Sequence, residues 1–194
     1  MALRRASLIV LTAVLAAAAG TAEAQTKSAD QQIAEAMSPL PDGLRAGAGV
    51  RALIEGALVT VRDGSNEMIC LADDPTREGF HAACYHRYLE PFMARGRELR
   101  AEGKTRPEID AMRLAEIEAG TLEMPSQPTA LYSLSSDHET WDAAAGMPAD
   151  ASGLYVIYLP YATPESSGIS VQPARDRPWL MYPGKPWAHV MISR

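Results

Sequence analysis

The chain has 194 residues, with 18 Lys or Arg side chains against 24 Asp or Glu, 47% hydrophobic residues and 22% charged residues. This composition is close to that of an average folded domain, so it excludes a disordered chain, a collagen-like repeat and a coiled-coil array. The acidic balance also argues against a nucleic-acid-binding protein, because such a protein needs basic surface to displace counterions from phosphates.

The first 24 residues have the three parts of a secretory signal peptide. Arg4 and Arg5 precede an apolar run over residues 6–19, and the small-x-small sequence of residues 22–24 forms a cleavage site before Gln25. A membrane anchor is the competing interpretation, but the run is shorter than the about 20 apolar residues that span a bilayer. Cleavage removes two basic side chains and one acidic one, which leaves 170 residues, 16 basic and 23 acidic side chains and a net charge of −7. We therefore expect a periplasmic or secreted protein with no membrane span in the mature chain.

Residues 25–49 are expected to form a flexible N-terminal segment that contains one short helix. The helix is predicted over residues 30–37, with Ser28 as its cap and Pro39 as the residue that prevents its continuation. The glycines and prolines that follow are typical of a linker. A single folded domain is therefore expected from residue 50 to the end of the chain.

Short β-prone runs begin this domain. The runs cover residues 50–54, 58–62 and 68–71, and the second and third are separated by Asp63-Gly64-Ser65-Asn66, which is rich in residues that tolerate positive φ. We expect a β-hairpin around this turn.

The mature chain holds two cysteines, Cys70 and Cys84. An exported protein meets an oxidising environment, so a disulfide between them is expected. Closing a loop of this length stabilises the fold by roughly 3 kcal/mol in the chain-entropy model. The alternative is a redox or nucleophilic cysteine, but the chain has no Cys-x-x-Cys sequence and no third cysteine.

Two helices are predicted in the middle of the chain. The first begins near Glu90, with Pro91 in its first turn, and ends before Gly103. The second begins at Thr105, which forms the Thr-x-x-Glu spacing of a capping box with Glu108, and it ends at a glycine in position 120. The short connection between them predicts a helical hairpin.

The remainder of the chain is predicted to form strands, because it is rich in proline and aromatic residues. The clearest strands cover residues 131–134 and 154–159, and a terminal hairpin is expected between residues 179–182 and 187–192, where Pro183-Gly184 suits a type II turn. The predicted fold class is therefore α+β: an antiparallel sheet with a packed helical hairpin and one disulfide.

One candidate site resembles the zinc-protease sequence His-Glu-x-x-His. His138, Glu139 and Asp142 have that spacing, with Asp in place of the second histidine. The competing interpretation is a helix cap, because Ser136 and Glu139 have capping-box spacing and the sequence marks no third ligand. The cap is favoured, so neither a metal nor another cofactor is predicted, and the usual nucleotide-binding motifs are absent from the sequence.

The second candidate site is a binding site around His189. Trp187 and His189 fall on one face of the last predicted strand, and Tyr182 belongs to a set of aromatic residues in the second half that could form a ligand groove. The competing interpretations are a half-buried histidine that is hydrogen-bonded to a carbonyl, and aromatic residues that fill the core.

Five short segments from residue 62 onward form a further pattern. They are Gly64-Ser65-Asn66 before Ile69-Cys70-Leu71, Cys84 before a helix, Leu99-Arg100-Ala101-Glu102-Gly103-Lys104 with a second helix after it, Pro128-Thr129-Ala130-Leu131-Tyr132-Ser133-Leu134-Ser135, and Tyr158-Leu159-Pro160-Tyr161. Their order resembles a family of uncharacterised secreted bacterial proteins with no assigned function. The resemblance covers most of the mature chain and implies export, one cysteine pair and a mixed α+β fold; it implies no catalytic residue and no substrate.

Two functions follow as hypotheses. The favoured one is a non-catalytic module that binds a small ligand or a protein through His189, Trp187 and Tyr182. The alternative is a metal-assisted or acid/base hydrolase that uses His138, Glu139 and Asp142.

Overall fold

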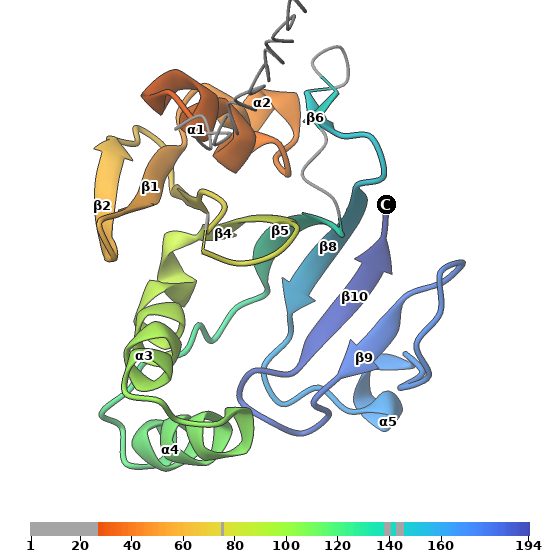
Figure 1. Ribbon diagram of the computed structural model, residues 1–194. Coiled ribbons are helices and arrows are strands. Elements are labelled where there is room, and N and C mark those ends of the chain that lie inside the picture. The colour runs from red at the N-terminus through yellow and green to blue at the C-terminus, as the bar shows by residue number, and fades with distance from the viewer. Residues whose placement is uncertain (1–26, 75, 138–140, 143–145) are drawn as a thin grey trace, which may run out of the picture.

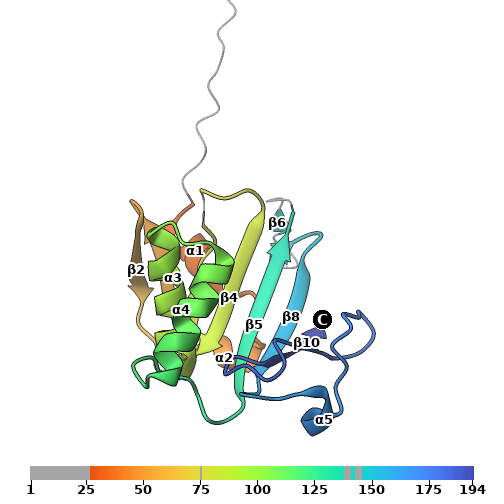
Figure 2. The ribbon, with the colours of Figure 1, turned by 90° about the horizontal axis from the view of Figure 1, so that it is seen from below.

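The computed structural model describes residues 27–74, 76–137, 141–142 and 146–194, and its main feature is an eight-stranded sheet with helices on both faces (Figures 1 and 2). The strand order is β2-β1-β3-β4-β5-β8-β10-β9, and β6 pairs with β7 separately. The helices are α1 (Ala29–Met37), α2 (Asp42–Arg45), the 3-10 helix η1 (Arg87–Leu89), α3 (Glu90–Ala101), α4 (Arg106–Glu118) and α5 (Pro164–Ser167). The strands are β1 (Gly49–Ile54), β2 (Ala57–Arg62), β3 (Met68–Leu71), β4 (Phe80–His86), β5 (Thr129–Ser136), β6 (Trp141–Asp142), β7 (Met147–Pro148), β8 (Ser152–Tyr158), β9 (Trp179–Met181) and β10 (His189–Ser193).

The α+β class is confirmed, but the sheet is mixed rather than purely antiparallel. β3 pairs with β1 in parallel, whereas the other neighbouring strands of the large sheet are antiparallel. The predicted hairpin between β2 and β3 is therefore wrong: the chain returns to β1 instead. The burial pattern gives the reason, because Val50 of β1 and Cys70 of β3 are paired and fully buried, while most of β2 is an exposed edge.

The predicted disulfide between Cys70 and Cys84 is confirmed, with an S–S distance of 2.04 Å. The two cysteines are direct cross-strand neighbours on β3 and β4, and both are fully buried. The bridge therefore lies in the core and joins two adjacent strands of the sheet.

One face of the sheet is covered by the N-terminal helices. Ser28 caps α1 as predicted, through a capping box. Ala36, Leu40 and Ala48 are fully buried in one cluster with Val50 and the cysteines. The sequence boundary at residue 50 therefore does not coincide with the edge of the packed core, because the apolar residues of segment 25–49 cover the disulfide side of the sheet.

The opposite face is turned toward α3 and α4, which contact each other and lie on that side of the sheet (Figure 2). We refer to residues 90–118 as the α3–α4 pair. Gly103, at φ 80°, ends α3, and the predicted capping box of Thr105 and Glu108 begins α4. Phe92 of α3 lies in one buried cluster with Tyr85 of β4 and Val156 of β8. The α3–α4 pair does not fill the whole face, and a cleft remains between it and the middle of the sheet.

The C-terminal hairpin forms as predicted, with β9 antiparallel to β10 and Gly184 at φ 72° in the connection. Tyr182, beside this connection, also has a positive φ of 51°, which is uncommon for a residue with a side chain. Among the described residues, no helix has the length and apolar character needed to cross a membrane.

Candidate functional site

A cleft of about 480 Å³ lies between the α3–α4 pair and the strands β3, β4, β5, β8 and β10. This volume is within the range of small-ligand sites. We call it the basic cleft, because four of its lining residues are arginines and none is Asp or Glu. Its polar lining residues are Arg97, Arg100, Arg106, Arg113, His81, His189, Tyr85, Tyr158, Tyr182 and Ser133.

His189 enters the cleft because side chains alternate along β10. Val190 packs on the other face against Leu180, which leaves His189 and Met191 on the cleft side. The His189 Nδ1 atom lies 2.8 Å from the backbone oxygen of Trp187. Since a carbonyl only accepts, Nδ1 carries the proton, and Nε2 of the neutral ring is an acceptor.

The surroundings of His189 favour this neutral form. Burial lowers the pKa of His189, and the positive charge of Arg106 lowers it further. The hydrogen bond to the Trp187 carbonyl acts in the opposite direction and raises the pKa, but its effect is smaller than that of burial. The ring lies between Tyr158 and Tyr182, with centroid distances of 5.0 and 5.7 Å. Burial raises the pKa of Tyr158 to about 12, so this phenol stays protonated at neutral pH.

Arg113 is the most buried arginine of the cleft, at 6% exposure. Its guanidinium lies 3.8 Å from the centroid of the Phe92 ring, and Nη1 donates to the Phe92 carbonyl at 3.2 Å. Nη2 donates to Asp110 at 3.0 Å, whereas the buried Nε has no partner among the described residues. Gly96 makes this position available, because a Cβ atom there would lie 2.8 Å from Nη1.

Arg106 lines the cleft from the first turn of α4. It pairs with Asp110 at 2.9 Å and donates to the hydroxyl oxygen of Tyr182 at 2.8 Å. Its guanidinium also lies 5.6 Å from the centroid of the Tyr182 ring. Arg106 therefore joins α4 to the β9–β10 connection across the cleft.

Glu90 holds the start of α3 against the sheet. Tyr85 of β4 donates to it at 2.5 Å, Arg97 pairs with it at 2.7 Å, and Arg51 of β1 forms a further ion pair. Burial alone would raise the pKa of Glu90, but the hydrogen bonds from Tyr85 and Arg51 and the charges of the two arginines outweigh burial and lower it. Glu90 is thus ionised at neutral pH and fixes Arg97 at the cleft.

The charge of the basic cleft is only partly neutralised. Two carboxylates outside its lining, Glu90 and Asp110, pair with three of its four arginines, and Glu90 is shared with Arg51 as well. The fourth, Arg100, is exposed and forms no ion pair with any described residue. The cleft therefore carries excess positive charge in a protein whose predicted mature form has a net charge of −7.

The structure places the predicted binding residues in two environments. His189 and Tyr182 line the basic cleft. Trp187 is 3% exposed and packs on Phe92, with ring centroids 5.7 Å apart, so it belongs to the core beside the cleft. Its buried Nε1 has no partner among the described residues.

The cleft arginines are not among the site residues predicted from the sequence, although their spacing carries a signal. Met93, Gly96, Arg97 and Arg100 have the spacing i, i+3, i+4 and i+7, so they form one stripe along α3. Arg106, Ile109 and Arg113 form a similar mixed stripe on α4. A helical stripe that mixes arginines with apolar or small residues is therefore the sequence signal that indicates which side of each helix faces the cleft.

The predicted hydrolase site falls mostly outside the described residues, which exclude His138 and Glu139. Asp142 lies in β6, a short strand rather than the predicted helix, and it pairs with Met147 of β7. No group of three or more His, Cys, Asp or Glu side chains within the described part of the chain could hold a metal ion.

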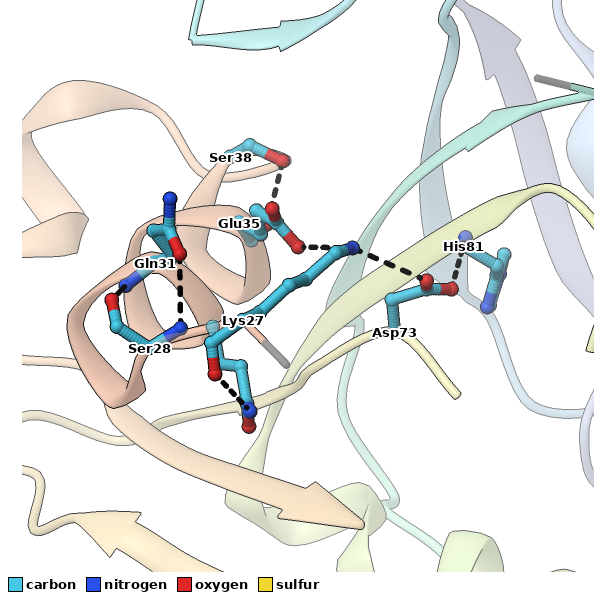
Figure 3. A network of polar contacts seen from close by, with 8 residues as sticks. Lys27, Ser28, Gln31, Glu35, Ser38, Asp73 and His81 are labelled. Carbon is cyan, nitrogen blue, oxygen red and sulfur yellow. Dashed lines mark hydrogen bonds and ion pairs between the residues drawn. The ribbon is translucent and has the colours of Figure 1, made fainter. Parts of the chain in front are cut away.

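A second polar cluster joins the N-terminal segment to the sheet (Figure 3). Lys27 lies 2.8 Å from Glu35 of α1 and 3.8 Å from Asp73, which follows β3. Asp73 in turn accepts a hydrogen bond from the backbone N–H of His81 at 2.9 Å. One cation lies between two carboxylates here, so the cluster is an internal anchor for α1 rather than an open ligand site.

Comparison of the chain with protein-family models, with curated proteins and with solved structures finds no match. The assignment of a function therefore depends on the chemistry of the basic cleft.

Proposed function

We propose that this protein is an exported, non-catalytic binding protein that takes an anionic ligand into the basic cleft. The observation that carries the proposal is the charge of the cleft: four arginines and two histidines line it, and no carboxylate does. Opposite charge in a partly enclosed site is what recognises an anion, because screening by water is weaker there than on an open surface.

The arginines are also positioned before a ligand arrives. Glu90 and Asp110 hold Arg97, Arg106 and Arg113 with ion pairs of 2.7 to 3.0 Å, but each guanidinium has five N–H donors, so donors remain for a ligand. Positioned arginines lose less side-chain entropy on binding and favour the planar, bidentate recognition of carboxylate or phosphate groups.

Export is the second part of the proposal. It rests on the signal-like sequence of residues 1–24, and the buried disulfide between Cys70 and Cys84 fits a protein that folds in an oxidising compartment. Sequencing the N-terminus of the protein recovered from its native host tests this part. Gln25 is expected as the first residue, and an intact Met1 on protein retained in the cytosol would contradict it.

Nuclear magnetic resonance tests the binding site. Titration of the mature ¹⁵N-labelled protein with butanoate is expected to shift the amide signals of α3, α4 and β10 at much lower concentration than those of α1 and β2. Arg100→Gln should weaken this response, because it removes the one cleft arginine without an ion pair among the described residues. Arg175→Gln, the same change at an exposed position outside the cleft, is the matched control. Shifts spread evenly over the surface, or equal effects of the two variants, would refute the proposal.

A further inference from the structure

The floor of the basic cleft is an apolar surface of the sheet. One row of side chains crosses β5, β8 and β10 and consists of Leu131, Val156 and Met191. The adjacent row crosses β3, β4, β5 and β8 and consists of Leu71, Ala83, Ser133 and Leu154. Since neighbouring strands lie about 4.8 Å apart, four strands give the floor a width of about 14 Å.

This floor is incompletely covered, although the α3–α4 pair lies over the same face. Leu131, Leu154 and Met191 are only half-buried, whereas Val50 and Cys70 on the opposite face are fully buried under α1. Layers of secondary structure normally pack so that such surface is removed from water. The basic cleft therefore offers apolar area that a ligand would bury.

The two exposed arginines of the basic cleft flank the turn between α3 and α4. Arg100 lies near the end of α3 and Arg106 at the start of α4, on either side of the turn at Gly103. Both arginines are exposed and both line the cleft. The arrangement thus provides a charged rim at the turn and an apolar floor that extends away from it.

We infer that the ligand is a single-chain amphiphile with an ionised acidic head, such as a medium-chain alkanoate. The acidic head of the ligand contacts Arg100 and Arg106, and its alkyl chain lies on Leu131, Leu154 and Met191. The inference rests on the proposed function and specifies its ligand class. It commits to a monomeric ligand rather than a membrane surface, because the floor lies between the sheet and the helices.

Isothermal titration calorimetry of the mature protein with butanoate, octanoate and decanoate tests the inference at about pH 7.5, where the carboxyl groups are ionised. One site is expected, with an affinity that rises about fourfold for each added methylene. Uncharged 1-octanol is expected to bind about tenfold more weakly than octanoate, and octylammonium more weakly still. Arg100→Gln should remove most of the advantage of octanoate over 1-octanol, and Arg175→Gln should leave it unchanged.

A variant with a larger side chain on the floor of the cleft tests where the alkyl chain of the ligand lies. Ser133→Phe places a ring in the second row of the floor, so it should abolish the gain from octanoate to decanoate while butanoate binding persists. Ala83→Met provides the same block on β4 if the first variant does not fold, and the thermal midpoint of each variant reports on folding.

The calorimetric results distinguish the proposal of anion binding from the inference that the ligand is an amphiphile. Equal affinities for butanoate and decanoate would overturn the amphiphile but leave anion binding in place, whereas no binding of any alkanoate would overturn both. Binding of octylammonium as tightly as octanoate would also overturn the ligand class. Association with phosphatidylglycerol vesicles without affinity for monomeric decanoate would identify a membrane surface instead and refute the inference.

Discussion

Gly96 determines where the guanidinium of Arg113 lies. Alanine is favoured over glycine inside a helix by about 1 kcal/mol, so Gly96→Ala would ordinarily stabilise α3. Here the new methyl group would lie 2.8 Å from Nη1 of Arg113 and displace it from the Phe92 carbonyl. We expect Gly96→Ala to give no gain in the free energy of unfolding, measured by urea denaturation, and to weaken anion binding.

The Arg113→Met background provides the control for this prediction. Without the guanidinium the clash is absent, so adding Gly96→Ala should now raise the free energy of unfolding by about 1 kcal/mol. The double-mutant cycle should give a coupling energy of about 0.5–3 kcal/mol, as is usual for residues in contact. Additive effects would mean that Gly96 does not set the position of Arg113.

His189 should make stability depend on pH in the mildly acidic range. Burial lowers its pKa in the folded protein, so the unfolded chain binds more protons below about pH 6.5. The stability contributed by the neutral ring is therefore present above that pH and is lost as the pH falls toward the folded pKa. The charged or titratable groups that face the ring are Arg106, Tyr158 and Tyr182.

The comparison with His189→Gln measures this effect. The glutamine amide can still donate to the Trp187 carbonyl but does not titrate, so the carboxylates that affect both proteins cancel in the difference. Urea denaturation at several pH values between about 7.5 and 5 should show the wild type losing stability relative to the variant as the pH falls. A difference that is constant over this range would show that His189 keeps an ordinary pKa.

At the scale of the elements, Glu90 connects α3 to two strands. Glu90→Gln leaves Arg51 and Arg97 without their carboxylate, and it should lower the free energy of unfolding by about 1–3 kcal/mol at neutral pH. The folded pKa of Glu90 is depressed, so its contribution is present above the unfolded pKa of about 4.3 and disappears as the pH falls through the folded value. The gap between wild type and variant should therefore narrow in acid.

The exposed Glu123, which is not part of this network, supplies the control. Glu123→Gln should change the free energy of unfolding by no more than about 0.5 kcal/mol at any of these pH values. If Glu90→Gln behaves like this control, the network does not hold α3 to the sheet.

Local signals in the sequence predicted the elements well. The capping residues Ser28 and Thr105 begin α1 and α4, and Gly184 lies in the connection of the C-terminal hairpin, because caps and turns depend on a few adjacent residues. The cysteine pair was also predictable, since only one intramolecular pairing existed.

Pairings between distant segments were not predictable in the same way. β3 bonds to β1 in parallel because Cys70 and Val50 are buried on the same side, and no local residue encodes that choice. The site was predicted in part: His189 and Tyr182 line the cleft, whereas the arginines come from α3 and α4. Which side of a helix faces a cleft depends on the packing of the whole domain, so the arginines resembled an ordinary solvated face.

At the scale of the molecule, the two faces of the sheet are covered differently. α1 packs closely on the disulfide face, where Cys70 and Cys84 are fully buried. On the other face, Phe92 and the Glu90 network connect α3 to the sheet, and the basic cleft remains over the middle strands. One face thus provides stability, and the other retains the apolar and charged surface that the proposed function needs.

This division predicts that the N-terminal segment is required for folding. A chain that begins at Pro41 lacks α1 and Leu40, and it uncovers Val50 and the disulfide. Burial of one leucine contributes about 1.5–3 kcal/mol, and a domain has a net stability of only about 5–15 kcal/mol, so loss of the whole covering layer should abolish the cooperative thermal transition seen by circular dichroism.

Two shorter truncations serve as references for the stability of the chain that begins at Pro41. A chain that begins at Lys27 keeps the anchor to Glu35 and the Ser28 cap, and it should melt like the full mature protein. A chain that begins at Ala29 loses both and should be less stable by about 1 kcal/mol from the cap, with a further loss from the ion pair. If the chain that begins at Pro41 melts cooperatively at the temperature of the mature protein, residues 25–40 are a peripheral tail, as the sequence suggests, and the core begins at β1.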